Sequence, residues 1–210
     1  MIRGWGYLDN RVIGVILSGG KSVRFQTPKA FAVYNSQYFY ERALSVLSSY
    51  VHHPIIVSHE SLRGRFPKHL SVIEDEGKVK GKGPLAGIYS AMKTVQASWY
   101  IVLPCDMPLL SEKVIEKLVE LIETEREVDG IVPIIKGQIQ PLVAAYHRRC
   151  LNEIEVLLEA ETYAMKRLLD KITVKYVTEK DLGCNAEQFQ NINTQKEYKE
   201  IGGYAGDKSI

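Results

Sequence analysis

The sequence has few cysteines and lacks the spacings that bind metals. Its three cysteines are Cys105, Cys150 and Cys184, and there is no CxxC pair, no Cys/His ligand spacing and no HExxH motif. Three scattered cysteines do not make the disulfide framework of a small secreted protein. The composition therefore excludes a disulfide scaffold and a zinc finger, and we expect a reducing, cytoplasmic compartment.

Long apolar runs and a large excess of charge of one sign are also missing. No run approaches the roughly 20 apolar residues of a membrane-spanning helix, and the first eleven residues lack the apolar centre of a signal peptide. The net charge is only +2, whereas proteins that coat nucleic acid carry a strong basic excess. We therefore expect neither a membrane nor a nucleic acid as partner. This net charge is compatible with a local basic pocket that binds an anionic small molecule.

What the sequence does contain is a regular alternation of short apolar runs and longer segments of helical period. Most of the runs are almost continuously apolar, which predicts strands covered on both faces. The expected strands are Val12–Leu17, Pro54–Ser58, Leu70–Glu74, Trp99–Pro104, Gly130–Ile135, Pro141–Tyr146 and Ile172–Val177. This alternation predicts one α/β domain over residues 1–210 with a three-layer, mostly parallel sheet. Residues 1–11 and 203–210 are expected to be loose ends.

Several of the expected helices carry their own start signals. Pro84 suits the first turn of a helix, Ser111 stands where an N-cap is expected, and Thr194 with Glu197 has the spacing of a capping box. The expected helices are Tyr38–Tyr50, Leu85–Val95, Ser111–Thr124, Leu151–Glu159, Tyr163–Leu169 and a short final helix after Thr194.

The loop after the first expected strand has the composition of an anion-binding loop. It reads "SGGKSVR" from Ser18 to Arg24 and is followed by Lys29. In parallel α/β sheets ligands bind at the carboxyl ends of strands. Glycines let backbone N–H groups approach a ligand, and Arg and Lys bind phosphate oxygens. Walker A and GxGxxG patterns are absent. The loop is predicted to bind a polyphosphate, with a glycine turn and solvated basic residues as the alternative.

Two later strand ends each carry a carboxylate. Asp75 precedes the Gly-Pro start of a helix, where free N–H groups attract anions, and is predicted to contact a nucleoside; an ordinary turn residue is the alternative. Asp106 follows a buried strand. A nucleoside triphosphate brings Mg²⁺, which prefers carboxylate and phosphate oxygens, so Asp106 is predicted to bind Mg²⁺. Helix capping is its alternative, although Ser111 stands at that position. Cys105 is expected to be a buried packing residue and not a nucleophile, because no histidine stands near it in the sequence.

The second half offers polar groups at two places. Gln140 and Pro141 open an expected strand that ends in the basic run His147–Arg149. Asn191 and Asn193 flank Ile192, so in an extended segment both carboxamides share one face while Ile192 points to the core. The two carboxamides suit a metal-bound water or a heterocycle edge, and satisfaction of the loop backbone is the alternative. For Arg148 and Arg149, a position in a solvated turn is as plausible as contact with a ligand.

Four segments carry a resemblance to a known family. "LSGGKSVRFQTPK", "GPLAGIYSAM", "LPCDMP" and "FQNINTQKEY" resemble motifs of the MobA-type molybdenum-cofactor guanylyltransferases, and the likeness runs from about Val12 to Ile201. Phe25, Gln26 and Pro28 replace the Met, Gly and Asp of the first motif. The resemblance implies a nucleotide-diphospho-sugar-transferase-like (Rossmann-like) fold. It also implies transfer of GMP from GTP to molybdenum-bound molybdopterin, with pyrophosphate as the second product.

The resemblance also assigns roles to residues. Arg24, Lys29 and Asp106 would be catalytic, with Mg²⁺ at Asp106. The GTP-binding residues would be Leu17, Ser18, Gly19, Gly20, Lys29, Asp75 and Asp106, and the residues on the pterin side would be Gln140, Pro141, Asn191 and Asn193. Besides GTP and molybdopterin, other proteins of molybdenum-cofactor biosynthesis are candidate partners.

Two rival functions stay open at this point. One is a related nucleotidyltransferase that uses CTP on the pterin, or a nucleoside triphosphate on a sugar phosphate. The other is a nucleotide-binding adaptor without turnover, which the departures at Phe25, Gln26 and Pro28 keep open.

Overall fold

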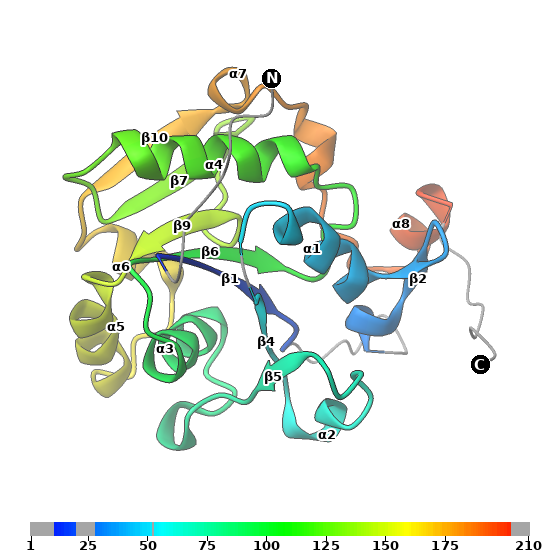
Figure 1. Cartoon of the computed structure of the whole chain (residues 1–210), viewed down its shortest axis with the longest axis horizontal. Helices are drawn as coiled ribbons and strands as arrows, with labels where there is room; N and C mark the ends of the chain where they lie inside the picture. Colours follow the sequence, from blue (N-terminus) through cyan, green and yellow to red (C-terminus); the bar gives the residue numbers. More distant parts are fainter. Residues whose placement is uncertain (1–10, 20–27, 52, 203–210) are drawn as a thin grey trace.

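A computed structural model describes residues 11–19, 28–51 and 53–202 of the chain. Within these residues, eight strands form a central sheet in the order β10-β7-β9-β6-β1-β4-β5, with β8 paired to β7 (Figure 1). The strands are β1 (Val12–Leu17), β4 (Ile55–Val57), β5 (Ser71–Ile73), β6 (Trp99–Pro104), β7 (Gly130–Ile135), β8 (Gln138–Ile139), β9 (Ala144–His147) and β10 (Val174–Thr178). A small hairpin of β2 (Val33–Tyr34) and β3 (Gln37–Tyr38) lies apart from the sheet. The expected loose ends lie almost wholly outside the described residues.

Helices connect most of these strands. The α-helices are α1 (Phe39–Ser48), α2 (Glu60–Arg63), α3 (Pro84–Thr94), α4 (Glu112–Thr124), α5 (Cys150–Glu159), α6 (Met165–Leu169), α7 (Glu179–Leu182) and α8 (Gln195–Glu200). Three short 3₁₀ turns are η1 (Lys29–Phe31), η2 (Gly77–Val79) and η3 (Ala186–Phe189). None of the helices in the described part of the chain is long and apolar enough to cross a membrane.

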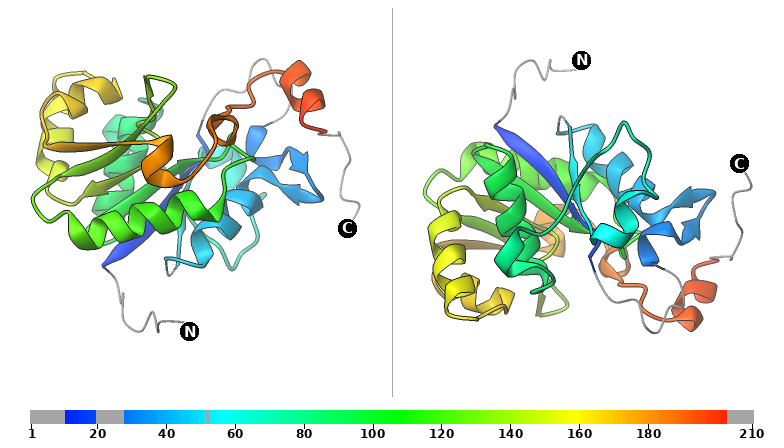
Figure 2. Two further views of the ribbon diagram at one scale, coloured as in Figure 1. Left: turned by 90° about the horizontal axis from the view of Figure 1, so that it is seen from above. Right: turned by 90° about the horizontal axis from the view of Figure 1, so that it is seen from below.

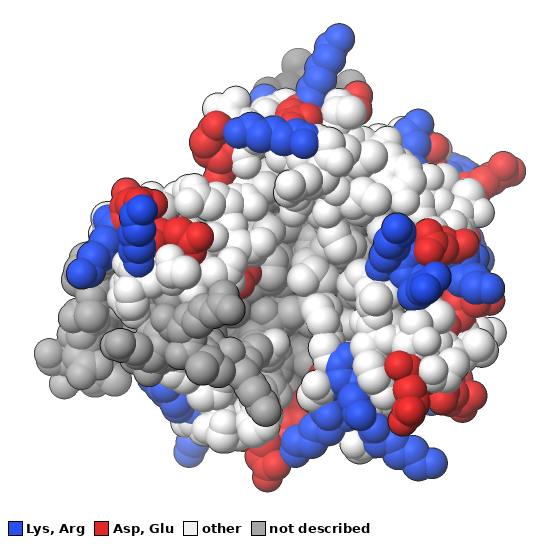
Figure 3. Space-filling model, turned by 180° about the vertical axis from the view of Figure 1, so that it is seen from behind, with Lys and Arg blue, Asp and Glu red and all other residues white. Residues whose placement is uncertain are grey.

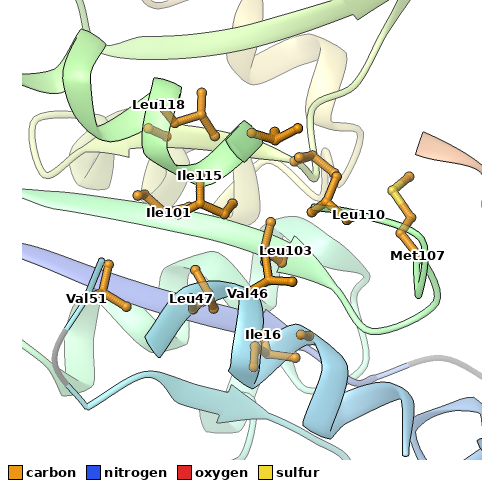
Figure 4. Packing of buried hydrophobic residues seen from close by; sticks show 14 of the residues in the cluster. Ile16, Val46, Leu47, Val51, Ile101, Leu103, Met107, Leu110, Ile115 and Leu118 are labelled. Carbon is orange, nitrogen blue, oxygen red and sulfur yellow. The ribbon is translucent and has the colours of Figure 1, made fainter. Parts of the chain in front are cut away.

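The sheet has helices on both faces, which confirms the predicted three-layer arrangement. Helices α1 and α4 cover one face, and α3, α5 and α6 cover the other (Figure 2). Alternate residues of β1 divide between the two cores: Ile16 packs with Leu47 of α1, whereas Val15 packs with Ile88 of α3. Figure 4 shows the first of these cores, in which side chains from β1, β6, α1 and α4 interdigitate. Burial on both faces explains why the strands are apolar without alternation.

The sheet is mostly parallel, as predicted, but one central strand runs the other way. Strand β1 pairs in parallel with both β4 and β6, and β10 pairs in parallel with β7. Strand β9 is antiparallel to its neighbours β6 and β7. Since apolar content does not encode strand direction, the sequence pattern did not reveal this reversal.

One predicted strand start was wrong, and one predicted N-cap residue is in place without its cap hydrogen bond. The strand expected from Pro141 begins only at Ala144, because the chain turns before it, with the Val143 N–H donating to the Gln140 carbonyl at 3.2 Å. Ser111 does precede α4, but its hydroxyl donates to the Gln188 side chain at 2.8 Å and makes no cap bond. By contrast, the capping box of Thr194 and Glu197 is present at the start of α8.

The tight packing of α1 on β1 requires a glycine at position 14. A Cβ added to Gly14 would lie 2.9 Å from both Leu47 Cδ1 and Val51 Cγ2. We expect Gly14→Ala to lower the free energy of unfolding by about 1–3 kcal/mol through overpacking. Gly64→Ala is the matched control, because Gly64 has a helical φ of −68° and open space around it. Urea unfolding of both variants measures the difference, and equal stabilities would contradict the packing account.

Candidate functional site

An ion pair joins two of the predicted site residues at the carboxyl edge of the sheet. Lys29, in η1, places its Nζ 2.8 Å from Oδ2 of Asp106, which follows β6. The two side chains are 17% and 21% exposed, so the pair is accessible but sheltered. Lys29 also donates a hydrogen bond to the carboxamide oxygen of Asn193, just before α8. Three segments far apart in the sequence thus meet at one ammonium group.

Neighbouring parallel strands account for this convergence. Strands β1 and β6 are in register from Val12 opposite Trp99 to Leu17 opposite Pro104, so both end at the same edge. Their pairing continues past the strands, since the Cys105 N–H donates to the Leu17 carbonyl at 3.1 Å. This hydrogen bond therefore fixes the backbone immediately before Asp106 relative to the sheet.

The other side of β1 brings two buried hydroxyl groups to the same edge. The Ser18 N–H donates to the Val57 carbonyl at 2.8 Å, and the Ser18 and Ser58 hydroxyl oxygens lie 3.4 Å apart. Ser58 was not among the predicted site residues, because a single serine after a short strand carries no sequence signal. Gly19 is exposed, and no atom of the described residues would lie within 4 Å of a Cβ placed there. The Ser18 N–H is therefore used within the sheet, whereas the described residues leave the backbone at Gly19 uncovered.

Asp75 lies near the end of β1 across the start of α3. A Cβ on Gly87 of α3 would lie 2.8 Å from Leu17 Cδ2 and 3.7 Å from Asp75 Oδ1, so the absence of a side chain allows these groups to approach. Asp75 Oδ2 accepts a hydrogen bond from the Gly81 N–H at 2.9 Å. Burial raises the pKa of Asp75, and the bond from Gly81 opposes that change. Its contact with a nucleoside stays a prediction.

A cavity of about 420 Å³ is lined by Met107, the residue after Asp106. Among the described residues, no Lys, Arg, Asp or Glu lines it. The lining residues are Met107, Gln138, Ile139, Gln140, Pro141, Leu142, Phe189 and Asn191. Three of the four predicted pterin-side residues are therefore together, while the fourth, Asn193, bonds Lys29 instead. Figure 3 shows a face of the molecule that is hollowed, with mostly uncharged atoms inside the hollow and Lys and Arg side chains at its lower margin.

The remaining predicted residues fall into two groups. Four of these positions lie outside the described residues: Gly20, Arg24, and the motif departures Phe25 and Gln26. The third departure, Pro28, is described. Arg148 and Arg149 have structural partners: Arg148 donates to the Met92 carbonyl at 2.9 Å and the Tyr100 hydroxyl at 2.7 Å, and Arg149 pairs with Asp129 at 2.8 Å. They follow the antiparallel β9, which ends at the opposite edge of the sheet from Asp106.

Comparison with known proteins agrees with this architecture. A family profile described as a MobA-like NTP transferase domain matches residues 14–176. The fold and this match define the class: the chain is a nucleotidyltransferase of the MobA-like NTP transferase family, as the sequence motifs predicted. A relative from Bacillus anthracis described as a probable molybdenum cofactor guanylyltransferase is 42% identical over 191 residues, which cover 90% of this chain and 94% of the relative. The chain belongs to this family of molybdenum cofactor guanylyltransferases.

Solved structures show the same fold. Molybdopterin-guanine dinucleotide biosynthesis protein A from Archaeoglobus fulgidus superposes with a TM-score of 0.73 at 24% identity, covering 90% of this chain and 95% of that one. A CMP:2-keto-3-deoxy-manno-octonic acid synthetase in complex with CTP gives a TM-score of 0.66 at 14% identity, covering 91% of this chain and 96% of that one. The predicted nucleotidyltransferase fold is confirmed. Because neighbours of this fold include a CTP-bound enzyme, the fold by itself does not choose the base.

The buried thiol of Cys105, next to Asp106 in the sequence, is unsuited to act as a nucleophile. Cys105 is 8% exposed, and burial, assisted by the adjacent Asp106, raises its pKa to about 12. Reactive cysteines need the thiolate. We expect Cys105→Ala to keep turnover within about threefold of the wild type, in keeping with a small buried packing residue. Steady-state pyrophosphate release measures this; a loss of activity in a variant with unchanged urea unfolding would show that the thiol takes part.

Proposed function

We propose that the chain transfers GMP from GTP to molybdenum-bound molybdopterin, forming the guanine dinucleotide cofactor and pyrophosphate. The observation that carries this proposal is the position of the Lys29–Asp106 pair. Asp106 follows β6, which ends beside the glycine-bearing end of β1, and the next residue, Met107, lines the cavity. A cation and a carboxylate next to both regions suit the transfer of a nucleotidyl group from a ligand in one to a ligand in the other.

The residues at this edge suit a divalent metal ion that arrives with the nucleotide. Asp106 supplies a partly exposed carboxylate, and Mg²⁺ commonly binds one or two carboxylates together with substrate phosphates and water. Among the described residues there is no group of three or more His, Cys, Asp or Glu side chains that could hold a metal without a substrate. When bound, the metal would neutralise charge on the triphosphate.

The protein side chains then have few chemical steps to perform. The attacking group is a phosphate of the pterin, which is already an anion, so no general base is needed. Lys29 would bind phosphate oxygens and stabilise the charge that builds up as pyrophosphate leaves. The backbone at Gly19 and Gly20, with the Arg24 side chain, would contact the triphosphate, and Asp75 would contact the nucleoside.

The cavity favours a pterin over a sugar phosphate as acceptor. Its lining combines apolar faces such as Ile139 and Phe189 with the carboxamides of Gln138, Gln140 and Asn191. Apolar faces suit the rings of a flat heterocycle, and carboxamides can both donate to and accept from its amide-like edge. The preference for guanine over cytosine rests on membership of the family.

The first test removes the charge of Asp106 without changing the shape of the side chain. We expect Asp106→Asn to lower turnover by roughly 10²–10³, the usual effect of losing a charge-stabilising group. Stability should change by less than about 1 kcal/mol, because partly exposed ion pairs contribute little. Asp129→Asn is the matched control, since Asp129 also pairs with a cation at 2.8 Å but at the opposite edge of the sheet. Pyrophosphate release that is equally reduced in both variants would contradict the role of Asp106.

The second test separates the proposed reaction from its rivals. Pyrophosphate release is measured with GTP, CTP or UTP, with molybdenum-bound molybdopterin or a sugar phosphate as acceptor. We expect release with GTP and the pterin, and at least about tenfold less with CTP, in line with rejection of a base that leaves buried polar groups unpaired. Preference for CTP or for a sugar phosphate would identify the related enzyme. Nucleotide binding in calorimetry without any pyrophosphate release would identify an adaptor.

A further inference from the structure

The segment that carries Asn193 is fixed to the site at its two ends. At one end, the Ile192 N–H donates to the carbonyl of Asp106 at 2.8 Å, and the Ile192 side chain is fully buried. At the other end, the buried Tyr198 of α8 reaches the hairpin that follows Lys29. Its hydroxyl accepts from the Val33 N–H at 2.8 Å and donates to the Val33 carbonyl at 2.7 Å. Asn193 lies between two points that are each tied to a site segment.

The start of α8 holds the backbone of Asn193 as well. Glu197 Oε2 accepts from the N–H groups of Asn193 and Thr194, each at 2.8 Å, and the Thr194 hydroxyl accepts from the Glu197 N–H at 3.2 Å. The hydrogen bond from Asn193 lowers the pKa of Glu197, together with the other bonds of the cap. These bonds leave the backbone of Asn193 little freedom to move its carboxamide away from Lys29.

The apolar contacts around Tyr198 are small, which makes the hydroxyl important. Ala32, Phe39, Ile192 and Tyr198 form a separate cluster away from the two cores of the sheet. The rings of Phe39 and Tyr198 meet edge to face, with centroids 5.9 Å apart. Even with Tyr34 and Ile201 packed against it, this small cluster has limited strength. Loss of the hydroxyl would leave a buried N–H and a buried carbonyl of Val33 without this partner.

We propose that Tyr198 is a positioning residue for the transfer reaction. Through Val33 and the cap at Glu197, it holds the carboxamide of Asn193 on the ammonium of Lys29 and so keeps that ammonium beside Asp106. The inference rests on the proposed function of Lys29, because the catalytic consequence follows only if Lys29 binds the phosphates. No contact between Tyr198 and a substrate is needed.

The kinetic test is a double-mutant cycle. Tyr198→Phe keeps the ring and removes the hydroxyl, and we expect kcat/KM for GTP to fall roughly 10- to 100-fold, the range that follows from a small misplacement of a reacting group. In an Asn193→Ala background, the same change should have no further effect. Tyr89→Phe is the matched control, because its hydroxyl donates to Glu155 at 2.6 Å between α3 and α5. Equal, additive losses in both backgrounds would overturn the inference, since Tyr198 would then act independently of Asn193.

A second variant covers the case in which Tyr198→Phe does not fold. Glu197→Ala removes the acceptor for the Asn193 N–H, and Glu197→Gln restores an oxygen at the same place. We expect kcat/KM to fall in the first and to return to near the wild-type value in the second. If glutamine does not restore activity in a protein of wild-type stability, the cap does not act by holding Asn193.

An activity-free readout separates this inference from the proposed function. Acetylation of Lys29 by an N-hydroxysuccinimide ester, followed site by site with mass spectrometry, measures how firmly the ammonium is held. We expect several-fold faster labelling of Lys29 in Tyr198→Phe and Asn193→Ala, and unchanged labelling in Tyr89→Phe. Unchanged labelling in all three overturns the positioning role. If wild type releases no pyrophosphate while labelling still rises in the two variants, the proposed function fails and the positioning role stands.

Discussion

The ion pair between Lys29 and Asp106 is the interaction around which the site is organised. Its two residues are 77 positions apart and meet because β1 and β6 are adjacent, parallel and end together. A pair that retains about a fifth of its exposure adds little net stability, so its value lies in what it can bind. In the proposed reaction each half exchanges its partner: triphosphate oxygens replace the carboxylate at Lys29, and a metal ion replaces the ammonium at Asp106. In this proposal, the free site already holds one cation and one anion where the substrate would bring the opposite charges.

Most of the frame of this site was predictable from sequence, for a simple physical reason. Strands buried on both faces must be apolar throughout, so β1, β6 and β7 were predicted with their observed bounds. Once a parallel sheet was inferred, the residues that follow its strands had to gather at one edge, which is why Lys29 and Asp106 were expected to lie together. The capping box of Thr194 was equally visible, because it depends on two side chains three residues apart.

What the sequence did not reveal depends on tertiary contacts. Apolar runs do not show direction, so the reversal of β9 was missed. Pro141 was counted into a strand although it lies in the turn before that strand. Ser111 stands at a capping position, yet its hydroxyl goes to Gln188, a partner 77 residues away. The resemblance assigned Asn193 to the pterin side, and its hydrogen bond to Lys29 was not foreseen. For Ser111 and Asn193, a residue far away in the sequence decides where the side chain bonds.

The central claim is that one nucleoside triphosphate is bound by Lys29 and Asp106 together, with its acceptor in the adjoining cavity. A crystal structure of the chain with a non-hydrolysable GTP analogue and Mn²⁺ tests this most directly, because the anomalous signal of manganese locates the metal independently of the nucleotide. The account predicts a manganese peak at bonding distance from a carboxylate oxygen of Asp106, with phosphate oxygens in its coordination shell and the ammonium of Lys29 on the triphosphate. A nucleotide bound with its metal elsewhere, and with the Lys29–Asp106 pair intact, would contradict it.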